Sequence, residues 1–217
     1  MPKVKIPRKS TIVDMTAMCD VAFLLLSFFI LATKQKPPEV MTVTPPNSIS
    51  SKVAPDKAIL ITMTKDGRAF ISLGDDTKKK DVLENVNLTQ SLGLSNAELA
   101  KWSKEEFYGL PLGQVKSSLA LSTPIAPARL PGIPIMDTTK NELETWLRSV
   151  TNVYAGGDQR ELQEMLLVKG DGETLYPVFN NIKRAFKRNK LYKFRIVTNG
   201  EVVPIGSELY RESQTVK

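Results

Sequence analysis

One acidic residue, Asp20, lies inside an otherwise apolar run near the N-terminus, DMTAMCDVAFLLLSFFILAT at residues 14–33. Keeping a carboxylate charged inside a bilayer costs about 2.5–3.5 kcal/mol on insertion scales. Removal from water favours the neutral form of an acid, so such a group can accept and release a proton near neutral pH. Asp20 is therefore a candidate proton-carrying residue. The alternative is that Asp20 lies near the interface, or pairs with a basic residue of another helix to hold an assembly together.

The chain lacks the residue types on which most enzyme sites depend. It has no histidine and one cysteine, Cys19, which removes Ser-His-Asp triads, histidine zinc ligands and internal disulfides. The sequence shows no glycine-rich phosphate loop, nucleophile elbow or paired-cysteine motif. We therefore expect no enzyme activity, no cofactor and no metal, and proton transfer must use carboxylates. The formal net charge of +7 would suit nucleic acid, but no nucleic-acid-binding motif accompanies it.

Four basic residues with no acid among them precede the apolar run: Lys3, Lys5, Arg8 and Lys9. Cytoplasmic flanks of membrane spans are enriched in such residues. The sequence therefore predicts a cytoplasmic basic tail over residues 1–12 and a transmembrane helix over residues 13–33, with everything later on the far side of the membrane. A cleaved signal peptide is the alternative. It is disfavoured by the acid within the run and by the lack of a small-x-small cleavage pattern in FILATKQK.

The acid shares one face of the predicted helix with four other residues. Spacings of three and four place these residues on that face: Ala17, Asp20, Leu24, Ser27 and Leu31. The small side chains of Ala17 and Ser27 permit another helix to approach closely. Because one helix cannot enclose a carboxylate, partner helices are required, and the chain is expected to be a subunit.

The apolar run resembles the signature of the ExbD/TolR biopolymer-transport family. The matching positions are Asp14, Met15, Thr16, Met18, Asp20, Val21, Phe23, Leu24, Leu25, Phe28 and Phe29. Two positions depart from the signature, since Ala17 replaces a proline and Cys19 replaces an aliphatic residue. Asp20 matches the essential membrane aspartate of the family.

The resemblance implies a function and a set of partners. It implies a single-pass subunit of a bacterial inner-membrane motor, with a cytoplasmic N-terminus and a periplasmic C-terminal domain. A dimer of the chain would lie inside a ring of a polytopic ExbB/TolQ-like subunit. Proton flow would then drive a TonB- or TolA-like protein that reaches the outer membrane.

The segment after the helix is rich in proline and short polar residues, so residues 34–56 are expected to form an extended periplasmic linker. Members of the family carry a short strand-like partner-contact motif here that ends in Leu-Pro. The nearest match in this chain is Thr42, Val43, Thr44 and Pro45. A passive spacer is the alternative for this segment.

Residues 57–217 are predicted to form a small α+β domain like that of the family. Residues 59–73 alternate apolar side chains around Asp66 and Gly67, which indicates a hairpin. A strand is expected over residues 166–169, and a closing strand around Phe194 and Ile196 that Asn199 and Gly200 end. The helix between them carries an apolar stripe of Val178, Phe179, Ile182 and Phe186, with Pro177 near its start.

A long, partly helical insert is predicted at about residues 75–162, and typical members of the resembled family lack it. Capping-box patterns at Ser95/Glu98, Ser103/Glu106 and Thr139/Glu142 each suggest the start of a helix. The last of these helices is expected over residues 140–155, with an apolar face that includes Trp146. The insert either binds a partner or enlarges the core, and we favour the larger core.

A basic stripe marks the last predicted helix, at Lys183, Arg184, Lys187, Arg188 and Lys190. We interpret this stripe mainly as a solvated helix face, with contact to an anionic partner such as cell-wall polymer as the alternative. The corresponding alternative for the whole chain is a membrane-anchored periplasmic binding module whose helix is only an anchor. A secreted enzyme ranks last.

Overall fold

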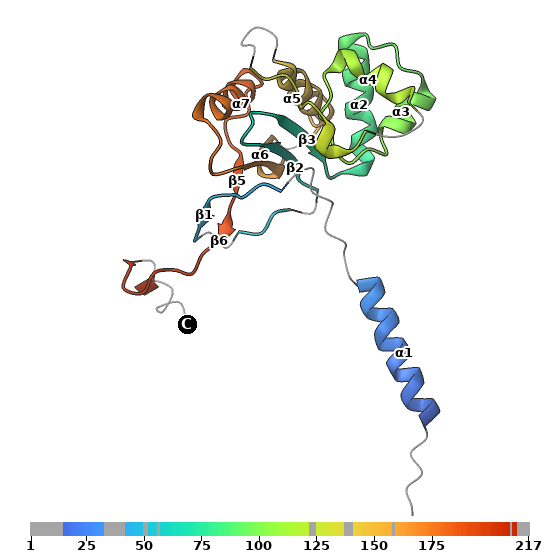
Figure 1. Ribbon diagram of the computed structural model, residues 1–217, viewed down its shortest axis with the longest axis vertical. Coiled ribbons are helices and arrows are strands. Elements are labelled where there is room, and N and C mark those ends of the chain that lie inside the picture. Colours follow the sequence, from blue (N-terminus) through green and yellow to red (C-terminus); the bar gives the residue numbers. More distant parts are fainter. Residues whose placement is uncertain are drawn as a thin grey trace, which may run out of the picture. The chain divides into compact units, whose positions relative to one another are not determined.

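The structure is a computed structural model that describes residues 15–32, 42–49, 52–55, 57–121, 125–136, 141–157, 159–208 and 210–211 (Figure 1). The chain divides into two compact units, Met1–Pro38 and Glu39–Lys217. The predicted basic tail and the first part of the predicted linker, residues 34–41, lie outside the described residues.

The first unit contains helix α1, Met15–Ala32, whose 18 residues include none that is buried. At about 1.5 Å per residue such a helix is about 27 Å long, close to the ~30 Å hydrocarbon thickness of a bilayer. It is long and apolar enough to cross a membrane by length and composition. The predicted apolar helix near the N-terminus is therefore confirmed, as a candidate single-pass anchor.

The second unit is built on a four-stranded mixed sheet. Strands β2 (Ile59–Met63) and β3 (Ala69–Leu73) form an antiparallel hairpin, and β4 (Leu166–Gly170) and β5 (Arg195–Val197) add in parallel, in the order β3-β2-β4-β5. Gly67 adopts a φ of +80° in the hairpin turn, a conformation that favours glycine. The predicted hairpin, central strand and closing strand are all present.

Helix α7, Tyr176–Arg188, connects β4 to β5 and buries the predicted apolar stripe. Val178, Ile182 and Phe186 are buried, Phe179 packs against the same core, and Pro177 lies in the first turn. Alternate residues of the sheet face this core: Ile59, Ile61, Met63, Ile71, Leu73, Leu166 and Val168. The 3.6-residue period of the helix and the two-residue period of the strands thus bury their apolar sides together.

The insert forms most of the remaining helices. These are α2 (Asp76–Gln90), α3 (Asn96–Trp102), α4 (Leu112–Leu119), the 3₁₀ turn η1 (Pro127–Arg129), α5 (Glu142–Val153) and α6 (Gln159–Met165). Helices α2, α3 and α4 lie together beside the sheet, and α5 packs between α2 and α7 (Figure 1). Its buried side chains, including Trp102, Tyr108, Trp146 and Leu147, belong to the same core cluster as those of the sheet. The insert therefore enlarges the core.

The three predicted capping boxes have different outcomes. Ser95 and Glu98 form the complete reciprocal box at the start of α3. The prediction at Ser103 is wrong, because Ser103 ends α3 and the chain then turns toward a bridge between Ile71 and Tyr108. For α5 the N-cap is Asn141, whose side chain accepts a hydrogen bond from the Leu143 N–H. Thr139 lies outside the described residues.

A second, two-stranded sheet differs from the expectation for the linker. Strand β1 (Asn47–Ser48) pairs in parallel with β6 (Asn199–Gly200), so residues that were expected to be a free tether lie against the domain. Asn199 and Gly200 do not simply end the closing strand, since they form β6. The pairing satisfies main-chain groups that proline-rich local sequence leaves without partners.

Candidate functional site

The polar side chains of α1 have different environments. Ser27 Oγ donates hydrogen bonds to the carbonyl oxygens of Phe23 and Leu24 over 2.9 and 3.0 Å, so its hydroxyl is satisfied within the helix. Asp20 is exposed on the helix surface, and its carboxylate has no hydrogen bond or ion pair with another described residue. A group that stabilises this carboxylate therefore has to come from outside the described part of the chain.

The predicted face of α1 is present as a continuous row. The helix extends without interruption over all five of its residues, Ala17, Asp20, Leu24, Ser27 and Leu31. Every described side chain of the row is exposed except Ser27, which is half-buried. Since a helix repeats every 3.6 residues, this row presents one acid and one hydroxyl along an otherwise apolar strip.

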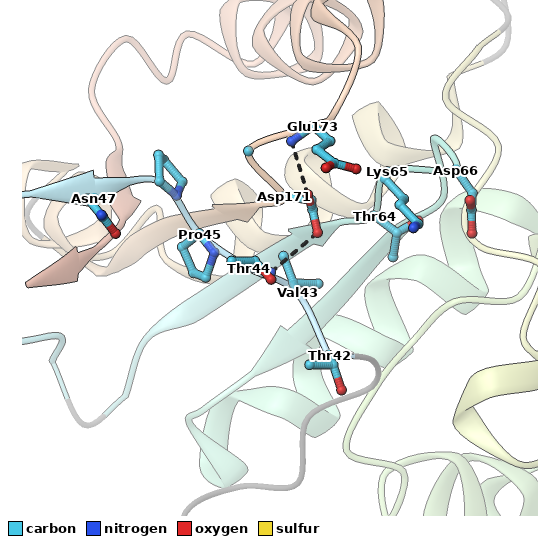
Figure 2. Close-up of a pocket in the computed structure, with 12 residues that line it drawn as sticks. Thr42, Val43, Thr44, Pro45, Asn47, Thr64, Lys65, Asp66, Asp171 and Glu173 are labelled. Atoms are coloured by element: carbon cyan, nitrogen blue, oxygen red, sulfur yellow. Dashed lines mark hydrogen bonds between the residues drawn. The ribbon is translucent and has the colours of Figure 1, made fainter.

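The second candidate region lies in the domain, at the predicted partner-contact residues. Val43 is only 6% exposed, and Thr44 is held on both sides of its peptide plane. Its N–H donates to Asp171 Oδ2 over 3.3 Å, and its carbonyl accepts the Gly172 N–H over 3.0 Å. Figure 2 shows the Asp171 carboxylate between Thr44 and Glu173. Residues 42–45 are thus fastened to the domain surface.

An open depression of about 550 Å³ adjoins this segment. Its lining comes from three places: residues 42–47, the turn after β2, and the loop after β4 (Figure 2). The charged side chains around it are Lys65, Asp66, Asp171 and Glu173, so acidic groups predominate. The N–H groups of Glu173 and Thr44 hold the pKa of the Asp171 carboxyl below its usual range, so it is ionised at neutral pH.

Two residues that the sequence did not single out fix the segment. Asp171 follows β4, and the Asp-Gly pair there indicates a turn. Asn199 donates from its main-chain N–H to the Pro46 carbonyl and from Nδ2 to the Pro45 carbonyl, each over 3.0 Å. An Asp-Gly turn is readable in sequence, but its bond to a residue 127 positions earlier is not.

The basic stripe on α7 is solvent-exposed at Lys183, Arg184, Lys187, Arg188 and Lys190. Arg188 forms a two-pronged ion pair with Glu144, with Nη1–O distances of 2.8 and 3.0 Å. In the described part of the chain, no group of three or more His, Cys, Asp or Glu residues could hold a metal ion.

A family model matches most of the chain. The model is described as "Biopolymer transport protein ExbD/TolR" and matches residues 7–201, which include α1, the insert and every described strand. Searches among curated proteins and among solved structures gave no significant match.

Proposed function

Because the chain belongs to the ExbD/TolR family of biopolymer transport proteins, we propose that it is a subunit of a proton-motive-force-driven complex of the bacterial inner membrane. The complex energises a TonB- or TolA-type protein for transport across the outer membrane or for its maintenance. Members of the family are transport components and not enzymes, and they generally work with ExbB/TolQ and TonB/TolA proteins. The partners of this chain are accordingly a polytopic ExbB/TolQ-like ring, a second copy of itself and a TonB- or TolA-like protein.

The observation that carries this proposal is the unpartnered carboxylate of Asp20 on α1. In a bilayer an acid without a partner is neutral, and an ionised acid requires a polar partner from another helix. Neutral Asp20 therefore lets α1 move against the surrounding ring, and ionised Asp20 holds it at a polar position there. Each proton that crosses a potential of 100 mV supplies about 2.3 kcal/mol to this cycle.

The proposal includes a topology. Residues 1–12 form the cytoplasmic tail, residues 13–33 cross the membrane, and the α+β domain is periplasmic. The excess of basic residues before the helix supports this orientation. In this arrangement residues 42–45 lie where the chain leaves the membrane region and joins the domain, so they are the proposed contact for the energised partner.

The test compares Asp20→Asn with Asp20→Glu in the full chain, purified with the ring subunit and reconstituted into vesicles. Asparagine keeps the size of the side chain and removes its titration, so we expect normal assembly without proton uptake. Glutamate keeps the titrating group, and part of the uptake should remain. Full proton uptake and transport by an assembled Asp20→Asn complex would refute the proposal.

The alternative is a membrane-anchored periplasmic binding module, and the exposed basic side chains of α7 favour it. It predicts that a generic apolar helix can replace residues 15–33 without loss of function. The proton-coupled proposal predicts complete loss of function in that chimera, even when the chimera still inserts into the membrane.

A further inference from the structure

The outer edge of β5 is open. β5 pairs with β4 on one side, and no described strand pairs with its other side. Residues 52–54 lie next to this edge, yet among the described residues no main-chain hydrogen bond joins them to β5. Unpaired strand edges bind additional strands, because their N–H and C=O groups still need partners.

Two adjoining depressions follow this edge, with volumes of about 400 and 290 Å³. They share Lys52 and Arg195 in their linings, so we treat them as one groove, the β5 groove. Its apolar lining consists of Val53, Ala54, Leu167, Ile196 and Val197 around the larger depression, with Phe194 in the smaller one. Its charged lining is mainly cationic, with Lys52, Arg160, Lys193 and Arg195 against Glu164, which lies 3.8 Å from Arg195. The β5 groove is therefore suited to an extended segment that is apolar and acidic.

Such a segment follows β6 in the same chain. We define the C-terminal arm as residues 201–208 and 210–211, which leave the body of the domain after β6 (Figure 1). Val202 and Ile205 are 86% and 87% exposed, far more than large apolar side chains in a finished surface need to be. Glu201 and Glu208 are also exposed.

We propose that the C-terminal arm of one copy docks in the β5 groove of a second copy, and that the exchange is reciprocal. Two observations select this occupant: the arm offers apolar and acidic side chains, and the groove offers apolar and basic ones. Residues 201–203 continue from β6 and can add to β5 as a short strand. Pro204, which lacks an N–H, then ends that strand. The proposed function enters only because it requires two copies in one complex.

Reciprocal docking makes the contact isologous, so each copy supplies one arm and one groove. Val202 and Ile205 become covered, and Glu201 and Glu208 approach Lys52, Lys193 and Arg195 of the second copy. Opposite charges at such contacts fix the register of the partners more than they add affinity. The pair of copies is thereby closed, and no groove is left open to a third copy.

The test uses disulfide trapping in the full chain, with Cys19→Ser to remove its single cysteine. One tagged copy carries Val202→Cys, and a differently tagged copy carries Ile196→Cys, which is 49% exposed in the groove. The matched control replaces Ile196→Cys by Leu88→Cys on α2, at a site that is 70% exposed. All three substitutions are at exposed positions, so folding should be retained.

We expect about tenfold more mixed disulfide dimer from the Val202/Ile196 pair than from the Val202/Leu88 control. Adding Glu201→Lys and Glu208→Lys to the arm should bring the yield down to the control level. Equal yields from both pairs would overturn the inference, and so would a disulfide that forms only within a single chain carrying Val202→Cys and Ile196→Cys. The assay does not measure proton transfer, so its result is independent of the Asp20→Asn test.

Discussion

The main-chain N–H of Thr44 donates a hydrogen bond to Asp171 Oδ2 over 3.3 Å, although 127 residues separate the two in sequence. Thr44 belongs to the segment that leads from the membrane helix, and Asp171 directly follows the central strand β4. This bond, with the return bond from the Gly172 N–H to the Thr44 carbonyl, joins the beginning of the domain to one end of its sheet.

Removal of the Asp171 carboxylate should release residues 42–48 from the domain. We expect Asp171→Ala to lower the hydrogen-exchange protection of the Thr44 amide strongly and that of β2 amides hardly at all. Glu173→Gln is the matched control, because it changes a neighbouring carboxylate and leaves the Asp171 bonds in place. Unchanged protection of Thr44 in Asp171→Ala would contradict the assigned role.

The same bond predicts a pH dependence. The pKa of Asp171 is lower in the folded chain than its usual value, so the folded state binds this proton less tightly than the unfolded state. The stabilisation is therefore present above the ordinary aspartate range and is lost as the pH falls through the lowered value. Protection factors at Thr44 should be constant from about pH 5 to about pH 8 and fall only in acid.

Glu142 caps a helix that is remote in sequence. Its carboxylate accepts the Leu112 N–H over 2.8 Å at the start of α4, where Pro111 supplies no side-chain cap. We expect Glu142→Ala to lower the free energy of unfolding by about 1 kcal/mol, as other lost caps do. Glu142→Gln keeps an oxygen acceptor and should cost less, which urea denaturation of both variants can measure.

The pH dependence at Glu142 has the opposite sign to that at Asp171. Burial raises the pKa of Glu142, and the Leu112 N–H opposes this rise, so the folded chain holds the proton more tightly than the unfolded chain. Stability therefore falls as the pH rises from the ordinary glutamate range through the raised value. Glu142→Gln should remove this part of the pH dependence, and a variant that keeps it would show that another group is responsible.

Trp146 tests whether the insert and the sheet share one core. Its ring lies 5.6 Å from that of Trp102 and 5.1 Å from that of Tyr108, centroid to centroid. Trp146→Ala should cost about 3–5 kcal/mol and shift a single unfolding transition. Trp146→Phe should cost less, because the indole N–H has no partner among the described residues. Two separate transitions, with only one affected, would show that the insert folds independently.

The position of the acid on α1 can be tested by moving it. A step of one residue turns a side chain by about 100°, whereas a step of four residues returns it to the same face. We expect Asp20→Ala with Leu24→Asp to restore part of the proton uptake, and Asp20→Ala with Val21→Asp to restore none. Equal recovery by both double variants would show that the face does not matter.

The elements that the sequence predicted correctly have local causes. The hairpin of β2 and β3, the stripe of α7 and the capping box at Ser95 each depend on residues a few positions apart. The errors have non-local causes. Glu142 caps α4 from 30 residues away, and β1 finds its partner 152 positions later, between Asn47 and Asn199. Neither pairing leaves a periodic pattern in the sequence.

For the candidate sites the division is similar. The type and spacing of residues were sufficient to identify Asp20 as the chemically unusual group, because an acid within an apolar run is visible without a structure. The partner of its carboxylate is absent from the described residues, so no pattern within this chain could reveal it. For residues 42–45 the sequence indicated a contact segment, but Asp171 and Asn199, which hold it, became visible only after folding.

The pairing of β1 with β6 determines where the domain would part under tension. A pull transmitted from the membrane through residues 33–41 reaches Thr44 and β1 before it reaches the four-stranded sheet. β1 and β6 share only two residue pairs, whereas β2 and β4 share five, so the small sheet breaks first. Release of residues 42–48 would lengthen the leash by roughly 20 Å, at about 3.3 Å per extended residue, while the core stays folded. Mechanical work up to that extension would then leave the domain intact.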